Sequence, residues 1–472
     1  MDRVLIISLL TVLFVGRLET FGQNEKPRVI VTTDGEADDR ASMVRFLLTS
    51  NEFDVEGIIN SSSQFHWVGG TGWNAFHPAS WVKEYIDLYA KVYDNLRLHD
   101  PNYPSPEYLL SKWKVGNING IGEDDIRTEG AELIVQILLD DSDPRPVWIQ
   151  AWGGCNTISR AFKIIQEDYP ERMEEVARKI RLFLIWEQDE TYQEYIRPNW
   201  EHFNIPTIIS DQFDCIAYIW PHVLPEKVKV YFEAEWMRKN IITGHGPLCD
   251  VYENNKGAFN AEGDTPSFLH SIPNGLRSME SPGNGGWGGR YVKVRNNVWM
   301  DPLPDSSYKR PIGQWSINDS WSKKMENDST NDKLEIRTNY FKPIWRWLKD
   351  VQNDFAVRAD WCIKDYASAN HHPIVRLKTP LDIKATPGWK VKLNASSTVD
   401  PDGDDLHFKW WHYSEAGTYT GNTLGESKTA KTTITIPKDA RPGETIHMIC
   451  EVSDSGTPSL IRYQRVVITV IP

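Results

Sequence analysis

The segment VIVTTDGEADDR occupies residues 29–40 and contains a strand, a loop and the start of a helix. Its first five residues are apolar or β-branched, which is typical of a parallel strand buried on both faces. The acidic loop that follows runs into residues 41–48, where Met43, Val44 and Leu47 recur at helical spacing. A strand that leads directly into a helix indicates a βα unit, from which parallel sheets are built.

Further pairs of strands and helices follow along the chain. Short apolar strands are expected at residues 55–59, 147–150, 181–185 and 206–209, and helices at 131–139, 158–165 and 340–351. We therefore predict an α/β fold, with a doubly wound and mostly parallel sheet, over residues 27–362. Residues 280–330 are rich in Gly, Asn, Asp, Ser and Pro, so we expect an irregular segment that lies on the surface.

The pattern changes after His371-His372-Pro373, where short strands alternate with turns. Strands are expected at residues 389–393, 407–411 and 466–470. About a hundred residues of this kind predict a C-terminal all-β sandwich over residues 373–472, which resembles immunoglobulin- or cadherin-like modules. Trp410 and Trp411 point to opposite faces of their strand, so one is expected in the core and the other at the surface. His371 and His372 are expected to do no more than open the linker.

The composition of the 472-residue chain points to sugars rather than nucleic acids. It has 52 Lys and Arg against 65 Asp and Glu, a net charge of −13, and no basic stripe to meet phosphates. The chain has an unusually high number of Trp, 20 in all. Aromatic faces stack on the apolar faces of sugar rings, so this number suggests a carbohydrate ligand, although most of the Trp are expected in the core. The five Cys lie far apart, which disfavours a thiolate metal site and leaves one or two disulfides open.

Residues 1–22 contain an apolar run at 4–15 that is too short to span a bilayer and has the form of a cleaved signal peptide. No later stretch approaches the run of about 18 apolar residues that a membrane span needs. We therefore expect a secreted or periplasmic protein without a membrane span. Its oligomeric state is left open.

Four carboxylates, those of Asp34, Glu36, Asp38 and Asp39, crowd six positions directly after the first strand. In an open parallel sheet this loop lies at the carboxyl edge, where ligands bind. Carboxylates this close repel one another, and a hard cation with oxygen ligands is the agent that best offsets the repulsion. The alternative is an acidic first helical turn stabilised by the helix dipole, which explains two acids more easily than four. The loop therefore predicts a metal site.

The loop also resembles the nucleoside hydrolase signature Asp-x-Asp-Pro-Gly-x-Asp-Asp, with Asp34, Asp38 and Asp39 on its second, third and fourth acids. Residues 57–60 (GIIN) resemble that family's second strand, and residues 152–157 (WGGCNT) resemble its Gly-Pro-x-Thr-Asn segment. The similarity is closer to a secreted branch of cellulose-binding, nucleoside-hydrolase-like proteins, over about residues 27–360. It is carried by four motifs, TDGEADDR at 33–40, SSQFHW at 62–67, GDTPSFL at 263–269 and GGWGGR at 285–290.

The resemblance implies a role for each acid of the site. Asp39 and Asp264, with the backbone of Asn156, would hold Ca²⁺. Asp38 would grip sugar hydroxyls, and Asp34 would activate a water as general base. The reaction implied is hydrolysis through an oxocarbenium-like transition state.

The chain departs from the nucleoside hydrolase signature at two points. Thr32 stands in place of the first acid, and Gly35-Glu36 replaces Pro-Gly. One calcium ligand is therefore lost or moved to Glu36. A nucleoside hydrolase in the strict sense is the weakest enzyme prediction, because the chain carries no visible signature of a nucleobase pocket.

Other candidate residues surround this loop. His66 is a candidate acid near the end of the second strand, and a buried structural histidine is an equal alternative. Sugar contacts are expected from polar and aromatic residues at strand ends and in the Gly-rich segment, namely Asn60, Gln64, Trp67, Gln188, Asp189, Trp287 and Arg290. Trp287 lies between paired glycines, so we expect it to form an exposed platform or lid. We expect Arg290 to pair with an acidic group of the substrate or to form a structural ion pair. Residues 400–405 (DPDGDD) predict a structural Ca²⁺ site or a plain Asp-Gly turn.

Three functions fit the sequence. The first is a carbohydrate-active, metal-assisted hydrolase that acts on glycosidic bonds of polysaccharide-derived oligosaccharides. The second is a dehydratase or lyase that eliminates water from uronate-containing oligosaccharides, with the metal offsetting the charge of an enolate. The third is a polysaccharide-binding protein without catalysis, which ranks last because an acid cluster at a strand end is more than binding requires.

Overall fold

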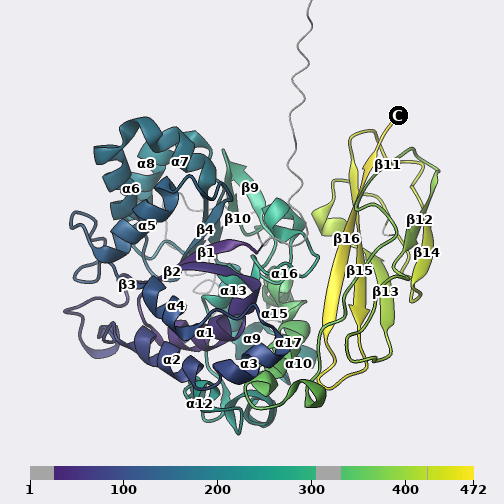
Figure 1. The fold of residues 1–472 in the computed structure, drawn as a ribbon. Helices are drawn as coiled ribbons and strands as arrows, with labels where there is room; N and C mark the ends of the chain where they lie inside the picture. The colour runs from purple at the N-terminus through teal and green to yellow at the C-terminus, as the bar shows by residue number, and fades with distance from the viewer. Residues whose placement is uncertain (1–25, 304–330, 423) are drawn as a thin grey trace, which may run out of the picture.

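The computed structural model describes residues 26–303, 331–422 and 424–472. The predicted signal peptide at 1–22 and residues 304–330 of the predicted irregular segment lie outside the described residues. The described chain forms an α/β domain followed by a C-terminal β-sandwich, as predicted (Figure 1). In the part of the chain that the structure describes, none of the helices is both long and apolar enough to cross a bilayer.

An eight-stranded sheet forms the centre of the α/β domain, with the strand order β3-β2-β1-β4-β5-β6-β10-β9. The strands are β1 (Arg28–Thr33), β2 (Asp54–Asn60), β3 (Trp113–Val115), β4 (Val147–Ala151), β5 (Ile180–Ile185), β6 (Thr207–Ser210), β9 (Val292–Arg295) and β10 (Val298–Met300). All neighbouring pairs from β3 to β10 are parallel, and only the edge strand β9 runs antiparallel. The five strands expected from the sequence therefore all form, and they lie side by side in one mostly parallel sheet.

Helices cover both faces of this sheet (Figure 1). Three of them were predicted, α1 (Ala37–Leu48), α5 (Glu129–Leu139) and α6 (Asn156–Asp168). The others are α2 (Trp81–Ala90), α3 (Tyr93–His99), α4 (Pro106–Lys112), α7 (Met173–Lys179), α8 (Arg197–Trp200), α9 (Trp220–Val223), α10 (Glu226–Lys229), α11 (Ala234–Met237), α12 (Pro247–Asp250) and α13 (Thr265–Leu269). Alternate residues of β1 enter two separate cores, Val29 and Val31 beside α1 and Ile30 beside α5 and α6.

The prediction of a single helix at 340–351 is wrong, because this region contains the end of one helix, all of a second and the start of a third. They are α15 (Asn331–Tyr340), α16 (Lys342–Trp345) and α17 (Leu348–Trp361). Pro343 lies in the first turn of α16. Proline has no N–H to donate to the preceding turn, so it starts a new helix rather than continuing the old one.

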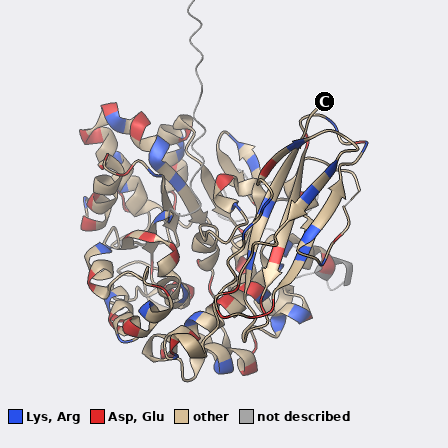
Figure 2. Cartoon of the chain, turned by 45° about the vertical axis from the view of Figure 1, so that its right-hand side comes forward, with Lys and Arg blue, Asp and Glu red and all other residues tan. Residues whose placement is uncertain are grey.

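The C-terminal sandwich contains a four-stranded sheet, β11-β16-β15-β13, that packs on the pair β12-β14. The strands are β11 (Asp382–Ala385), β12 (Lys390–Asn394), β13 (His407–His412), β14 (Lys431–Thr435), β15 (Thr445–Ser453) and β16 (Ile461–Val470). Figure 2 shows basic and acidic residues interspersed over this domain and the α/β domain alike.

The sandwich is packed firmly on the α/β domain. Trp411, Tyr413 and Tyr463 belong to the same apolar core as the helices α1, α13 and α17. The Tyr463 hydroxyl donates to Asp350 over 2.7 Å, and Arg465 donates to three backbone carbonyls of residues 276–285. One of Trp410 and Trp411 was expected at the surface, but both are buried, because Trp410 packs in the core of the sandwich and the α/β domain covers Trp411.

The two histidines of the linker also differ from expectation. His371 lies 2.9 Å from Asp402 of the sandwich, and His372 lies 2.7 Å from Asp354 of α17. Burial is the main reason that the pKa of His372 falls to about 4. The linker is therefore held by hydrogen bonds to both domains.

The Gly-rich segment at 283–289 is irregular, but most of it is buried rather than on the surface. Gly285 and Gly289 have φ of 74° and 106°, and a Cβ on Gly288 would lie 2.3 Å from the carbonyl oxygen of Pro266. Gly288 therefore permits close backbone packing between the Gly-rich segment and α13.

Candidate functional site

The acidic loop lies where the order of the sheet reverses, between β1 and β4. The strands on one side of this point run β1, β2, β3, and those on the other run β4, β5, β6. Loops that leave the carboxyl ends of such neighbouring strands open a crevice that binds ligands in doubly wound folds. Here the loops touch, because a Cβ on Gly153 would lie 2.9 Å from the Cβ of Asp34.

Helix α1 brings two of the acids to this crevice and anchors a third. Asp38 and Asp39 lie in its first turn, and Arg45 lies in its last turn. The Arg45 guanidinium donates to both carboxylate oxygens of Glu262, at 2.5 and 2.9 Å. Since Glu262 precedes Asp264 by two residues, this buried pair ties the segment that carries Asp264 to the acid-bearing helix.

Asp38, Asp39 and Asp264 form one compact cluster. Each offers a carboxylate oxygen, and these oxygens lie within 4.8 Å of one another. All three side chains are buried, and the Thr33 hydroxyl donates to Asp39. Within the described residues, Oδ2 of Asp264 and Oδ2 of the adjacent Asp34 are buried without a hydrogen-bond partner.

Burial and mutual repulsion raise the pKa values of these acids. Desolvation, followed by the charge of Glu36, raises the pKa of Asp34 to about 7. The pKa values of Asp38, Asp39 and Asp264 lie well above the ordinary value for the same two reasons, burial first and neighbouring carboxylates second. Unpartnered buried carboxylate oxygens of this kind are the donor set of a hard divalent cation, so the residues fit Ca²⁺.

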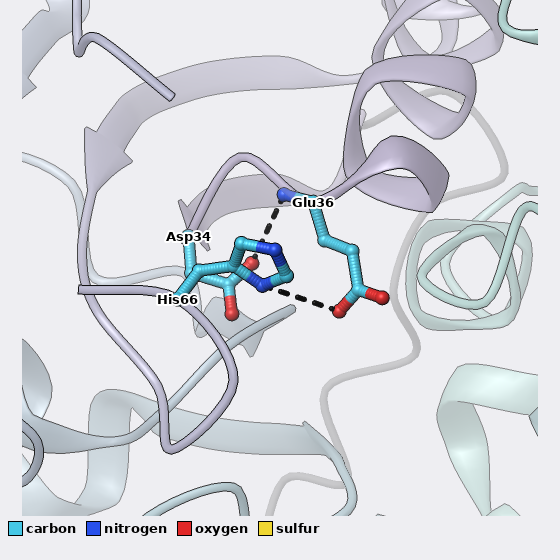
Figure 3. A group of neighbouring side chains, drawn as sticks. All are labelled: Asp34, Glu36 and His66. Atoms are coloured by element: carbon cyan, nitrogen blue, oxygen red, sulfur yellow. Dashed lines mark hydrogen bonds and ion pairs between the residues drawn. The ribbon is translucent and has the colours of Figure 1, made fainter. Parts of the chain in front are cut away.

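A second group joins Asp34 to Glu36 and His66 (Figure 3). Nδ1 of His66 lies 3.5 Å from a carboxylate oxygen of Glu36, and the Glu36 backbone N–H donates to Asp34 over 3.3 Å. The His66 backbone N–H donates to Ser63 over 3.1 Å, which fixes the start of the side chain. The structure therefore brings the predicted acid, His66, to the predicted base, Asp34.

Tyr218, which the sequence analysis missed, also reaches this group. Its hydroxyl donates to Glu36 over 2.7 Å and lies 3.2 Å from a carboxylate oxygen of Asp38. The residue lies in the loop that follows β6, so it comes from another carboxyl end of the same sheet. No local pattern marks it, but its position after a predicted strand could have drawn attention to it.

Family models match both domains of the chain. Residues 28–291 match the model described as "Cellulose-binding Sde182, nucleoside hydrolase-like domain", and residues 390–470 match "Cellulose-binding protein Sde0182, C-terminal domain". The chain belongs to this Sde182 family. The first match covers the acid loop, Asp264 and the Gly-rich segment, so the whole cluster is part of the family domain.

A solved structure agrees with this family membership. A nucleoside hydrolase-related hypothetical protein from Saccharophagus degradans, described as associated with carbohydrate metabolism, is 30% identical, with a TM-score of 0.74. The match covers 94% of this chain and all of the other. A plant nucleoside hydrolase matches at 10% identity and a TM-score of 0.28, over 68% of this chain and 99% of its own. No curated protein matches the chain.

Several residues predicted to contact sugar in this Sde182-family chain also hold the loops together. Gln188 donates to the carbonyls of Trp152 and Ile185, at 2.6 and 2.9 Å. Asp189 accepts from the backbone N–H groups of Asn156 and Thr191 and from the Thr191 hydroxyl. Both side chains are buried and support the crevice, and their contact with sugar stays a prediction.

Asn156 and Asn60 are likewise engaged inside the protein. The Asn156 amide donates to Ser62 and to the carbonyl of Asn117, and its oxygen accepts from Ser61. Oδ1 of Asn60 accepts from the Trp113 indole over 2.8 Å. The backbone role predicted for Asn156 in calcium binding stays a prediction.

Gln64 and Trp67 lie half-buried in the loop after β2, next to His66. The prediction that Trp287 is an exposed platform is wrong, because its side chain is 1% exposed and its indole N–H donates to Tyr463 of the sandwich. Arg290 lines a different space, a cavity of about 290 Å³ that it shares with Arg346, which directly follows α16, and with residues of the sandwich.

The acidic turn of the sandwich, residues 400–405, is a weaker candidate for a metal site, because its carboxylates already have partners. Oxygens of Asp400, Asp402 and Asp404 lie within 4.8 Å of one another. Asp402 is paired with His371, and Oδ1 of Asp400 accepts the backbone N–H groups of Asp402 and Asp404. These contacts fit the turn, and the structural calcium stays a prediction.

Proposed function

We propose that this protein is an exported, metal-assisted hydrolase that cleaves glycosidic bonds in polysaccharide-derived oligosaccharides. One observation carries the proposal, the buried cluster of Asp34, Asp38, Asp39 and Asp264 at the switch point of the sheet. Keeping four carboxyl groups out of water beside one another is costly, and binding a sugar alone does not require it. Catalysis does require groups whose pKa lies near the working pH.

In this proposal the acids divide into two functions. Asp39 and Asp264 hold the cation, with Asp38 beside them to accept hydrogen bonds from sugar hydroxyls. A bound Ca²⁺ would offset the charge of the cluster and orient the oxygen groups of the sugar. Asp34, whose pKa lies at about 7, takes a proton from the attacking water as general base.

His66 is placed to serve the leaving group. Glu36 lies 3.5 Å from Nδ1 of the ring, close enough to orient the imidazole toward the site. In this proposal His66 is the acid and Asp34 the base for hydrolysis of the glycosidic bond. The role of Glu36 is then to position His66, in place of the calcium contact also considered for it.

The second candidate function is a polysaccharide-binding protein without catalysis. The descriptions of both family models support this alternative, since both name cellulose binding. This alternative predicts that neutralising Asp34 changes nothing but affinity, whereas the hydrolase proposal predicts loss of turnover with retained binding.

Turnover of a panel of neutral and uronate-bearing oligosaccharides, followed by mass spectrometry, tests the proposal. The wild-type protein with Ca²⁺ is expected to release shorter chains, and Asp34→Asn is expected to release none while still binding. Asp350→Asn is the matched control, because Asp350 accepts a hydrogen bond from Tyr463 that an amide oxygen can also accept. Equal turnover by wild type and Asp34→Asn would sink the catalytic role of Asp34.

A further inference from the structure

The loop after β2 presents an exposed tryptophan beside the acid site. Trp73 is 69% exposed, although it is one of the largest apolar side chains in the protein. Its ring lies 6.3 Å from the His66 ring at 81° and 6.2 Å from the Phe65 ring at 38°. Because His66 also lies beside Glu36, the tryptophan stands one side chain away from the acids.

The backbone that carries Trp73 is fixed while its ring faces solvent. The Asn74 side chain donates to the Phe65 carbonyl over 2.7 Å, and the backbone of Trp67 forms a bridge with Ala75. A Cβ on Gly70 would lie 2.2 Å from the Asn74 carbonyl, so the turn is tightly closed. The ring is therefore held at the site without being buried by the protein.

Tyr218 is a second exposed aromatic side chain at the same site. It is 49% exposed, and its hydroxyl contacts both Glu36 and Asp38. Glu36 thus connects the two aromatics, directly to Tyr218 and through His66 to Trp73. Single exposed aromatics are common on protein surfaces, but here Tyr218 contacts the acids directly and Trp73 contacts His66 beside them, so the two rings flank one site.

The chemistry of this arrangement points to one class of ligand. An aromatic ring beside carboxylates matches a pyranose unit, which has an apolar C–H face and hydroxyl groups that donate to carboxylates. A uronate would add a negative charge beside a site that already gathers the carboxylates of Asp34, Glu36 and Asp38. Uncharged pyranose units therefore suit the site better than acidic ones.

We propose that Trp73 and Tyr218 form an aromatic subsite that binds uncharged pyranose units of a polysaccharide chain next to the acid cluster. The inference rests on the proposed function only in taking the acid cluster as a sugar site, and it holds whether the bound chain is cleaved or merely retained. It also assigns the substrate class, since it favours neutral glycans over the uronate-containing oligosaccharides.

Isothermal titration calorimetry on the full chain with Ca²⁺ tests the subsite. The probes are a neutral β-linked glucan hexasaccharide and a uronate hexasaccharide of the same length. Trp73→Ala is expected to raise the Kd for the neutral probe about tenfold, and Trp73→Tyr is expected to recover most of the loss. Trp389→Ala is the matched control, because Trp389 is 62% exposed on the distant sandwich.

The outcomes separate this inference from the proposed function. Unchanged affinity in Trp73→Ala, equal affinity for both probes, or no binding of the neutral probe each overturns the subsite. Loss of affinity in Trp73→Ala together with normal affinity in Trp389→Ala supports it. Absence of turnover by a wild-type protein that binds the neutral probe overturns the hydrolase proposal and leaves the subsite standing.

Discussion

Asp264→Asn separates the two opposing effects that the acid cluster has on stability. The Asp264 carboxylate repels its neighbours when the cation is absent, and it holds the cation when calcium is present. Its side chain makes no capping hydrogen bond to α13, and Oδ2 has no partner among the described residues. An asparagine of nearly the same volume therefore removes the charge and little else.

The size of the repulsion follows from the geometry. Two full charges 4.8 Å apart, the limit that encloses the cluster, repel by about 3 kcal/mol at an effective dielectric constant of about 20. Burial and neighbouring carboxylates raise the pKa values of Asp39 and Asp264, which favours the neutral carboxyl forms and so reduces the repulsion. We therefore expect metal-free Asp264→Asn to be about 1 to 3 kcal/mol more stable than the metal-free wild type.

Calcium should reverse this order. A ligand at 100 times its Kd stabilises the folded state by about 2.7 kcal/mol, and the variant loses a ligand for it. Urea denaturation in EDTA and in increasing Ca²⁺, with Asp350→Asn as control, measures both effects. A calcium-dependent gain in Asp264→Asn equal to that of the wild type would refute the assignment of the cluster as the metal site.

Three further predictions concern the Gly-rich segment and the contacts that hold the sandwich and the linker in place. Gly288→Ala should lower the free energy of unfolding by about 1 to 3 kcal/mol, because its Cβ meets the Pro266 carbonyl at 2.3 Å. Gly425→Ala, whose Cβ would meet nothing within 4 Å, should leave it unchanged, and equal effects in urea denaturation would count against the packing argument. Arg465→Ala leaves three buried carbonyls without their donor and should cost about 3 kcal/mol; a loss under about 1 kcal/mol would contradict this. His372 is held neutral, with its pKa lowered to about 4, so the stability it contributes is present above about pH 6.5 and is lost as the pH falls toward 4. The pH dependence of the unfolding temperature should be shallower in His372→Gln, and an unchanged profile would reject this.

The sequence predicts the sheet because its signal is local. Residues 29–33 are apolar or β-branched, and the other four predicted strands are also short runs in which apolar residues predominate. Neighbouring parallel strands then bring their carboxyl ends together, so Asp34 and Asp39 could be placed at the ligand edge without coordinates. Asp264 lies far along the chain, and only the resemblance to a family pointed to it.

The wrong predictions concern residues whose burial or contacts depend on parts of the chain that are distant in sequence. Paired glycines around Trp287 favour an exposed loop in isolation, but the sandwich covers them and Tyr463 binds the indole. Trp411 lies on a face that a lone sandwich would expose, and the α/β domain buries it. His371 and His372 have no acidic residue nearby in sequence, since Asp402 and Asp354 come from opposite sides of the linker.

The aromatic residues of the site were missed for a related reason. Trp73 lies in a polar loop without periodicity, where it could not be told from the other 19 of the 20 tryptophans. Tyr218 follows β6, and only the strand order shows that β6 and β1 have their carboxyl ends at the same edge. Both residues become candidates once the sheet places their loops beside the acids.

Hydrolysis of a glycosidic bond at the acid cluster can be detected by isotope labelling. A neutral oligosaccharide is incubated with the wild-type protein in ¹⁸O-labelled water, and the products are analysed by mass spectrometry. We expect one labelled oxygen for each bond cleaved by the wild type, and no labelled product with Asp34→Asn. Products that lack the label and have lost a water would mean elimination, and an intact oligosaccharide would mean binding alone; either result would rule out hydrolysis.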